Sequence, residues 1–161
     1  WSKRFATVPN EMSGVLVDGG HDAGKEAVRL FERTTKDWRN KPHFTYTIRV
    51  SGGKVMLSAG TDDEIYGYVS GGTRPHEIRP RRAKILAFPG GYTAKTTPGM
   101  FASHPGGAHG PMVYTKRVHH PGTKPRRFIE GIEKQMSTIA PQIIEKHIRT
   151  WANRKILEGQ R

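Results

Sequence analysis

The sequence predicts an α+β fold, in which a small antiparallel sheet of four to five strands packs against an N-terminal helix and a long C-terminal helix kinked at a proline. Residues 44–50 alternate apolar and polar side chains, which is the pattern of a strand with one buried face. Residues 22–38 and 124–157 place apolar side chains at helical spacing. The 19 glycines and 11 prolines indicate many turns or long loops and disfavour a helical bundle.

The length and composition limit the class of protein. A chain of 161 residues is expected to form a single domain over residues 1–161. Because the chain has no cysteine, disulfides and thiolate metal sites are excluded. No apolar run approaches the roughly 20 residues that span a bilayer, so we expect no integral membrane protein.

The N-terminal part is expected to hold one helix. Residues 1–21 are predicted to be irregular because Asp18-Gly19-Gly20 interrupts them. The helix is predicted over 22–38, with Asp22 as its N-cap. It ends before Pro42, because proline lacks an amide donor and disfavours helical geometry in the preceding residue.

The strongest local prediction is a β-hairpin. The strand at residues 44–50 is followed by Ser51-Gly52-Gly53-Lys54 and then by the apolar residues 55–57. Two glycines supply the positive φ angles that a tight hairpin turn requires.

The middle of the chain predicts a short helix and further strands. Acidic residues 62–64 open the helix and Gly71-Gly72 closes it. Strands are predicted at 76–80 and 84–89, joined by a basic turn, and at 112–119. Residues 90–111 form a long Gly/Pro-rich loop without periodicity of its own, which is unusual inside a compact domain.

The C-terminal region over 124–157 is predicted to be helical. Thr123 is expected to cap this helix and Pro125 suits its first turn. Pro141 falls inside the apolar pattern and should kink or divide the helix.

The net charge is +13, from 27 Lys and Arg against 14 Asp and Glu. Such a chain implies an acidic partner, for example nucleic acid or an acidic protein surface, and a solvated surface without a partner is the alternative. The basic residues concentrate in two stretches, whose members are candidate contacts with a partner or with DNA: Arg74, Arg79, Arg81, Arg82, Lys84, Lys116, Arg117, Lys124, Arg126 and Arg127.

No group of residues predicts catalysis or metal binding. His119 and His120 are adjacent, so on a strand they point to opposite faces and cannot easily share an ion. His104 and His109 lie in the Gly/Pro-rich loop, where ligand geometry is poorly preorganised. Phosphate-loop and serine-nucleophile motifs are absent. We therefore expect a protein that is not an enzyme and that holds no cofactor.

Two turn motifs resemble those of the tail-completion, or neck, family of long-tailed double-stranded DNA bacteriophages. Gly72-Thr73-Arg74-Pro75-His76 with Ile78 is similar to the family's G-T-x-P-H-x-I turn. His120-Pro121-Gly122-Thr123 with Phe128 is similar to its H-P-G-T-x-x-x-x-F turn, which precedes a long C-terminal helix. The residues expected to build the two turns are Gly72, Thr73, Pro75, His120, Pro121, Gly122 and Thr123.

The resemblance implies a structural virion protein of the phage neck, made in the host cytoplasm. Members of the family form rings, usually hexameric, around the DNA channel. The resemblance also implies contacts with neighbouring neck, connector or tail-tube proteins and non-specific contact with packaged DNA. The 90–111 loop is longer than the family pattern, and we expect it to insert into a neighbouring component. A basic nucleic-acid-binding module is the alternative function, and a histidine-dependent nuclease is a third hypothesis that lacks a competent set of residues.

Overall fold

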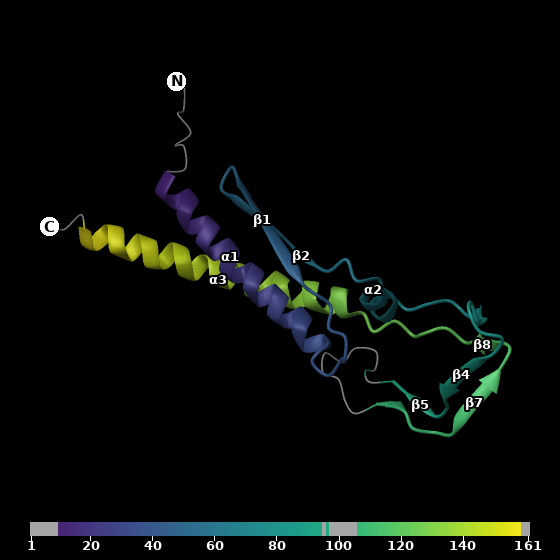
Figure 1. The fold of residues 1–161 in the computed structure, drawn as a ribbon. Helices are drawn as coiled ribbons and strands as arrows, with labels where there is room; N and C mark the ends of the chain where they lie inside the picture. The colour runs from purple at the N-terminus through teal and green to yellow at the C-terminus, as the bar shows by residue number, and fades with distance from the viewer. Residues whose placement is uncertain (1–9, 95, 97–105, 159–161) are drawn as a thin grey trace. The chain divides into compact units, whose positions relative to one another are not determined.

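The computed structural model of the chain describes residues 10–94, 96 and 106–158 (Figure 1). These residues form helices and short antiparallel strands, which confirms the α+β class. The elements are α1 (Asn10–Thr34), β1 (Thr45–Ser51), β2 (Lys54–Gly60), α2 (Glu64–Gly71), β3 (His76–Ile78), β4 (Leu86–Pro89), β5 (Tyr92–Thr93), β6 (Gly107–Ala108), β7 (Met112–Thr115), β8 (Val118–His120) and α3 (Phe128–Glu158).

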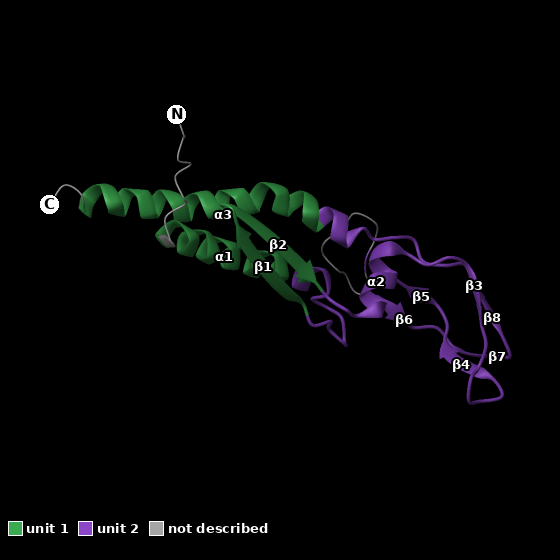
Figure 2. Cartoon of the chain, turned by 90° about the horizontal axis from the view of Figure 1, so that it is seen from above, with its two compact units in different colours: residues 1–31, 44–60, 132–161 green, residues 32–43, 61–131 purple. Residues whose placement is uncertain are grey.

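Two compact units make up the chain (Figure 2). Unit 1 comprises residues 1–31, 44–60 and 132–161, and unit 2 comprises residues 32–43 and 61–131. The prediction of a single sheet is wrong, because β1–β2, β3–β8, β4–β7 and β5–β6 each form a separate two-stranded sheet. The hairpin β1–β2 belongs to unit 1 and the other strands to unit 2. The expectation of a single domain over 1–161 stays a prediction.

In unit 1, α1 begins at Asn10, so the predicted irregular segment 1–21 is wrong for residues 10–21. Gly19 and Gly20 suggested that no helix forms before residue 22, but the helix continues through them. Glycines occur in this part of α1 because other side chains and backbone atoms lie too close to leave room for a Cβ. A Cβ on Gly19 would lie 3.2 Å from the Cα of Ile144 in α3, and one on Gly24 would overlap the ring of Tyr46 in β1. Tertiary packing against these residues outweighs the low helix propensity of glycine.

Asp22 does not cap α1, because it lies well inside the helix. Its carboxylate accepts hydrogen bonds from Lys25 Nζ at 2.9 Å and from His147 Nε2 of α3 at 3.1 Å. These two hydrogen bonds hold the pKa of the Asp22 carboxyl below its ordinary value, and the bond from Lys25 has the larger effect. The helix also ends earlier than residue 38, at Thr34.

The predicted hairpin is confirmed. Its ladder runs from Thr45 opposite Gly60 to Ser51 opposite Lys54. Gly52 and Gly53 form the turn with φ angles of 56° and 74°, in the region that favours glycine.

In unit 2, α2 confirms the predicted short helix and supplies the core. Asp63 caps it, because its side chain accepts from the backbone N–H of Tyr66 at 2.7 Å. The Tyr66 side chain is 1% exposed. Its hydroxyl lies 3.1 Å from the Thr34 hydroxyl, and its ring stacks on Phe128 with centroids 5.7 Å apart.

The long helix α3 begins at Phe128, later than predicted, so Thr123 is not its cap and Pro125 lies outside it. Instead, the Ser70 hydroxyl of α2 accepts from the backbone N–H of Ile129 at 3.3 Å. The sequence could not reveal this cap because Ser70 is 59 residues away. Pro141 lies inside α3 without dividing it. Across the described ranges, none of the helices has the length and apolar character of a membrane span.

The buried Tyr66 hydroxyl predicts a loss of stability at alkaline pH. Burial raises the pKa of Tyr66 to about 12 from the ordinary value of 10.0. Because the folded chain keeps a proton that the unfolded chain releases, this contribution is complete below pH 10 and is lost as the pH rises towards 12. Tyrosinate absorbance should show a tyrosine that titrates near pH 12 and that disappears in Tyr66→Phe. A normal titration of every tyrosine would contradict the burial of this hydroxyl.

The remaining strands of unit 2 form one folded-back arm, defined here as residues 71–94 and 106–125. Its ladders are nested: β3 pairs with β8, β4 with β7 and β5 with β6. The segments 76–80 and 84–89 therefore pair with distant strands and not with each other. The ends of the predicted 90–111 loop are paired as β5 and β6, and residues 95 and 97–105 lie outside the described residues.

Candidate functional site

The two turn motifs meet at the base of the arm, in what we call the Thr73–Thr123 junction. Thr73 and Thr123 exchange backbone hydrogen bonds of 3.0 and 3.1 Å. Each motif also contributes a glycine with positive φ, 77° at Gly72 and 86° at Gly122. A Cβ on Gly72 would lie 2.6 Å from the Thr123 carbonyl oxygen, and one on Gly122 would overlap that of Thr73. Each turn therefore requires glycine because the other turn lies against it.

Histidines from both motifs continue the junction along β3 and β8. His76 and His120 are opposite each other in the ladder, and their rings stack with centroids 5.0 Å apart. His76 Nδ1 lies 2.9 Å from the Arg74 carbonyl, so that nitrogen donates. His120 Nδ1 accepts from the N–H of Gly122 at 3.0 Å. The two imidazoles thus hold the turns in place through opposite hydrogen-bond roles.

The two basic stretches come together at the far end of β3, where the ladder is interrupted. Residues 79–85 and 116–117 separate β3 from β4 and β7 from β8, and we call them the basic bend. Its cations are Arg79, Arg81, Arg82, Lys84, Lys116 and Arg117, all of them exposed. The sequence separates these residues into two stretches, and the nested pairing of strands brings them to one place.

Glu77 is the acidic residue of the arm, and its carboxylate forms ion pairs with two cations of the basic bend. Arg79 Nη2 lies 2.8 Å from one carboxylate oxygen and Arg117 Nη1 lies 3.6 Å from the other. The hydrogen bond from Arg79 is the main reason that the pKa of Glu77 is lowered. The arm carries eight Lys and Arg in total, so a large positive excess remains.

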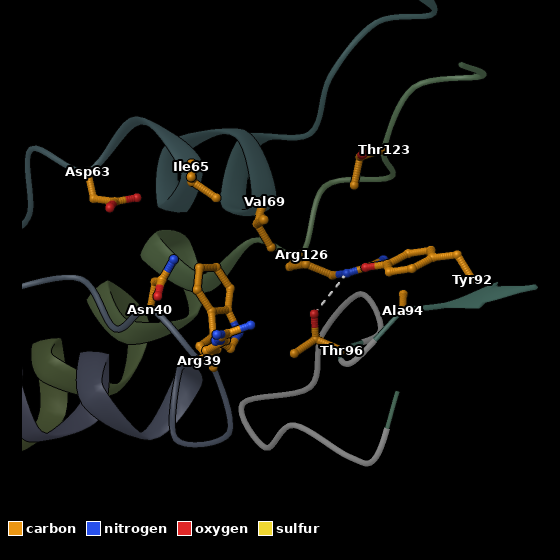
Figure 3. A pocket seen from close by; sticks show the side chains of 11 residues that line it. Arg39, Asn40, Asp63, Ile65, Val69, Tyr92, Ala94, Thr96, Thr123 and Arg126 are labelled. Carbon is orange, nitrogen blue, oxygen red and sulfur yellow. Dashed lines mark hydrogen bonds between the residues drawn. The ribbon is translucent and has the colours of Figure 1, made fainter. Parts of the chain in front are cut away.

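Arg126 differs from the other candidate contacts. It is 9% exposed, whereas Arg127, Arg74 and Lys124 are on the surface. The Arg126 Nε donates to the Thr96 hydroxyl at 3.1 Å, at the wall of a cavity of about 320 Å³ (Figure 3). Nothing in the sequence distinguishes this arginine from its neighbours, because its burial depends on a segment 30 residues away.

The arm has no core of its own. None of residues 71–94 and 106–125 is buried, although most of them belong to paired strands or turns. Large apolar side chains lie exposed among its cations: Ile78, Ile85, Tyr92, Met112, Val113 and Tyr114. A contiguous exposed apolar surface is typical of a site that contacts another molecule.

The other chemistry-bearing residues have structural positions. Acidic residues 62–64 lie at the start of α2, where Asp63 is the cap. His119 is opposite Glu77 in the ladder, and His104 lies outside the described residues. No cluster of three or more potential metal ligands occurs in the part of the chain that the structure describes.

Comparison of the chain with models of protein families, with curated proteins and with solved structures finds no match.

Proposed function

We propose that this chain is a structural subunit that assembles into a ring at the neck of a long-tailed double-stranded DNA bacteriophage, as a tail-completion or head–tail connector protein. The observation that carries the proposal is the arm, whose paired strands contain no buried residue. The resemblance of the two turn motifs supports the neck assignment. The protein would then be located in the virion and have no enzymatic activity.

An arm of this kind is expected to be completed by a neighbour. Two-stranded ladders are at best marginally stable in water, and stability comes from burying one face against another layer. Met112 and Tyr114 of β7 are exposed to 50% and 65%, and because they alternate with Val113 they lie on one face of the strand and offer such a surface. In a closed ring, here proposed as hexameric, every copy can present its arm to an identical neighbour or to the adjacent ring.

Self-association tests this proposal. Native mass spectrometry and sedimentation should show the wild-type chain as a closed oligomer at high concentration. Met112→Ser should weaken the association about tenfold, because it removes an apolar side chain from the interface. Met56→Ser is the matched control, since Met56 in β2 is 52% exposed but lies outside the arm. A wild-type chain that stays monomeric at millimolar concentration, or equal effects of both substitutions, would contradict the proposal.

The basic bend favours a second candidate function, which is non-specific binding of the DNA backbone. Its six cations are exposed and lie on two neighbouring segments of the arm, where they could neutralise several phosphates. Fluorescence anisotropy with random-sequence duplex DNA at two salt concentrations separates the candidates. Steeply salt-dependent binding by the monomer, reduced by Arg81→Gln, favours the DNA-binding module. Negligible binding by the monomer favours the connector.

A further inference from the structure

A cavity of about 320 Å³ lies in unit 2, beside α2 and the start of α3 (Figure 3). Its volume is at the lower end of the range for small-molecule sites. Its wall combines apolar and aromatic side chains, among them Trp38, Val69 and Tyr92, with the guanidinium of Arg126. We propose that this cavity binds a carboxylate carried on a small apolar body, with Arg126 receiving the carboxylate. The inference does not rest on the proposed function.

The burial of Arg126 supports this proposal. Its side chain is more than nine-tenths buried, and its Nε donates to Thr96. Among the described residues no carboxylate pairs with it, and the residues outside those ranges contain no Asp or Glu. A buried charge is costly unless it is paired with an opposite charge. The planar fork of a guanidinium matches a carboxylate in two parallel hydrogen bonds.

The cavity has a carboxylate of its own, but that group caps α2 and forms no ion pair with Arg126. Asp63 lines the wall, and its Oδ1 accepts from the backbone N–H of Tyr66 at 2.7 Å as the cap of α2. In the view of Figure 3, the side chains of Ile65 and Val69 lie between Asp63 and Arg126. Arg126 therefore has no neutralising partner in the described part of the chain, and the proposed ligand would supply one.

The apolar wall of the cavity also supports the proposal. Ile65 and Tyr92 line the cavity and are 62% and 73% exposed, so the chain itself leaves most of their apolar surface uncovered. Together with Val69 and Trp38 they would cover a few carbon atoms of a ligand while its carboxylate meets Arg126. This arrangement favours an aryl or branched aliphatic acid over inorganic phosphate, which has no apolar part.

Two sources could supply this chemistry: a free small acid, or an acidic residue beside a large apolar residue in a peptide segment. Titration of the isotope-labelled chain by NMR distinguishes them, with phenylacetate as the free acid and a capped dipeptide of phenylalanine and glutamate as the segment. Phenylacetamide is the uncharged control, and sodium phosphate tests for a bare anion. We expect dissociation constants of about 1 mM for the acids, with shifts of the Trp38 indole signal.

Arg126→Gln should weaken acid binding about tenfold or more, and Arg126→Lys should restore part of it. Arg127→Gln is the matched control, because it removes the same charge from the next residue, which is exposed. If Arg126→Gln fails to fold, Tyr92→Ala serves instead, because its side chain is mostly exposed and its loss should weaken binding without unfolding unit 2.

Stronger binding of the dipeptide than of phenylacetate assigns the cavity to a partner's segment, and the reverse assigns it to a free acid. Equal binding of phenylacetate and phenylacetamide, binding of phosphate alone, or equal binding by wild type, Arg126→Gln and Tyr92→Ala would overturn the proposal. So would the absence of any shift with both acids.

Discussion

Replacing Phe128 with alanine is expected to lower the free energy of unfolding by about 3–5 kcal/mol. Phe128 is 0% exposed and stacks on the buried ring of Tyr66. It is also the first residue of α3 and follows directly on the strained Arg127, whose φ is 58°. The alanine would leave a cavity where the start of α3 packs on α2, and the surrounding residues can only partly fill it.

Urea unfolding followed by circular dichroism measures this loss. Ile129→Ala is the control, because Ile129 is the next residue of the same helix and is 42% exposed. Its substitution should cost less than about 1 kcal/mol. Equal losses for the two substitutions would show that the ring of Phe128 is not buried as described.

Replacing Gly122 with alanine is expected to destabilise unit 2 by about 3 kcal/mol or more. Two costs combine, because φ is 86° at this residue and a Cβ would overlap the carbonyl oxygen of Thr73. The backbone cannot relax easily, because the N–H of Thr73 donates to the carbonyl of Thr123 and the N–H of Thr123 donates to the carbonyl of Thr73. Opening this junction would release the base of the arm.

Two other glycines separate the costs. Gly52 has a φ of 56° with open space around it, so Gly52→Ala measures the backbone strain alone, about 1 kcal/mol. Gly14 lies in α1 with open space, and Gly14→Ala should stabilise the chain by about 0.5–1 kcal/mol. If Gly122→Ala costs no more than Gly52→Ala, the close approach of the two turns is wrong.

Substitutions in the Thr73–Thr123 junction and substitutions on the exposed surface of the arm should have different effects on stability and assembly. Gly72, Gly122 and the threonine pair hold the arm at its base, so substitutions there should reduce stability and assembly together. Met112 and Tyr114 lie on the arm and are exposed, so their substitution should reduce assembly alone. Measuring both quantities for each variant therefore distinguishes an interface residue from a residue that the fold itself requires.

Local patterns in the sequence predicted those elements whose structure depends on neighbouring residues. The hairpin of β1 and β2 follows from strict alternation and from Gly52-Gly53. The short helix α2 follows from the acidic residues at its start. The apolar stripe of α3 predicted a long helix, although its first residues were placed four positions too early because Thr123 resembled a cap.

Local patterns gave wrong predictions where distant contacts decide the outcome. Gly19 and Gly20 were predicted to interrupt the chain before the helix, yet they are helical because Ile144 and Val55 pack against them. Ser70 supplies the α3 cap from α2, and no local pattern marks it. The predicted strands after α2 overlap with β3, β4, β7 and β8. Their pairing was not predicted, because each strand pairs with one far along the chain and not with its neighbour in the sequence.

The candidate sites also have features that the sequence alone determined and features that depend on the tertiary structure. The sequence by itself determined the excess of positive charge, the two basic stretches and the two glycine turns, because these are properties of residue identity and short spacing. Only the tertiary structure decided that the basic stretches meet at one bend, that the turns interlock and that Arg126 is buried beside a cavity. Each of these depends on segments 30 or more residues apart, which only the pairing of the strands and the packing around Arg126 bring together.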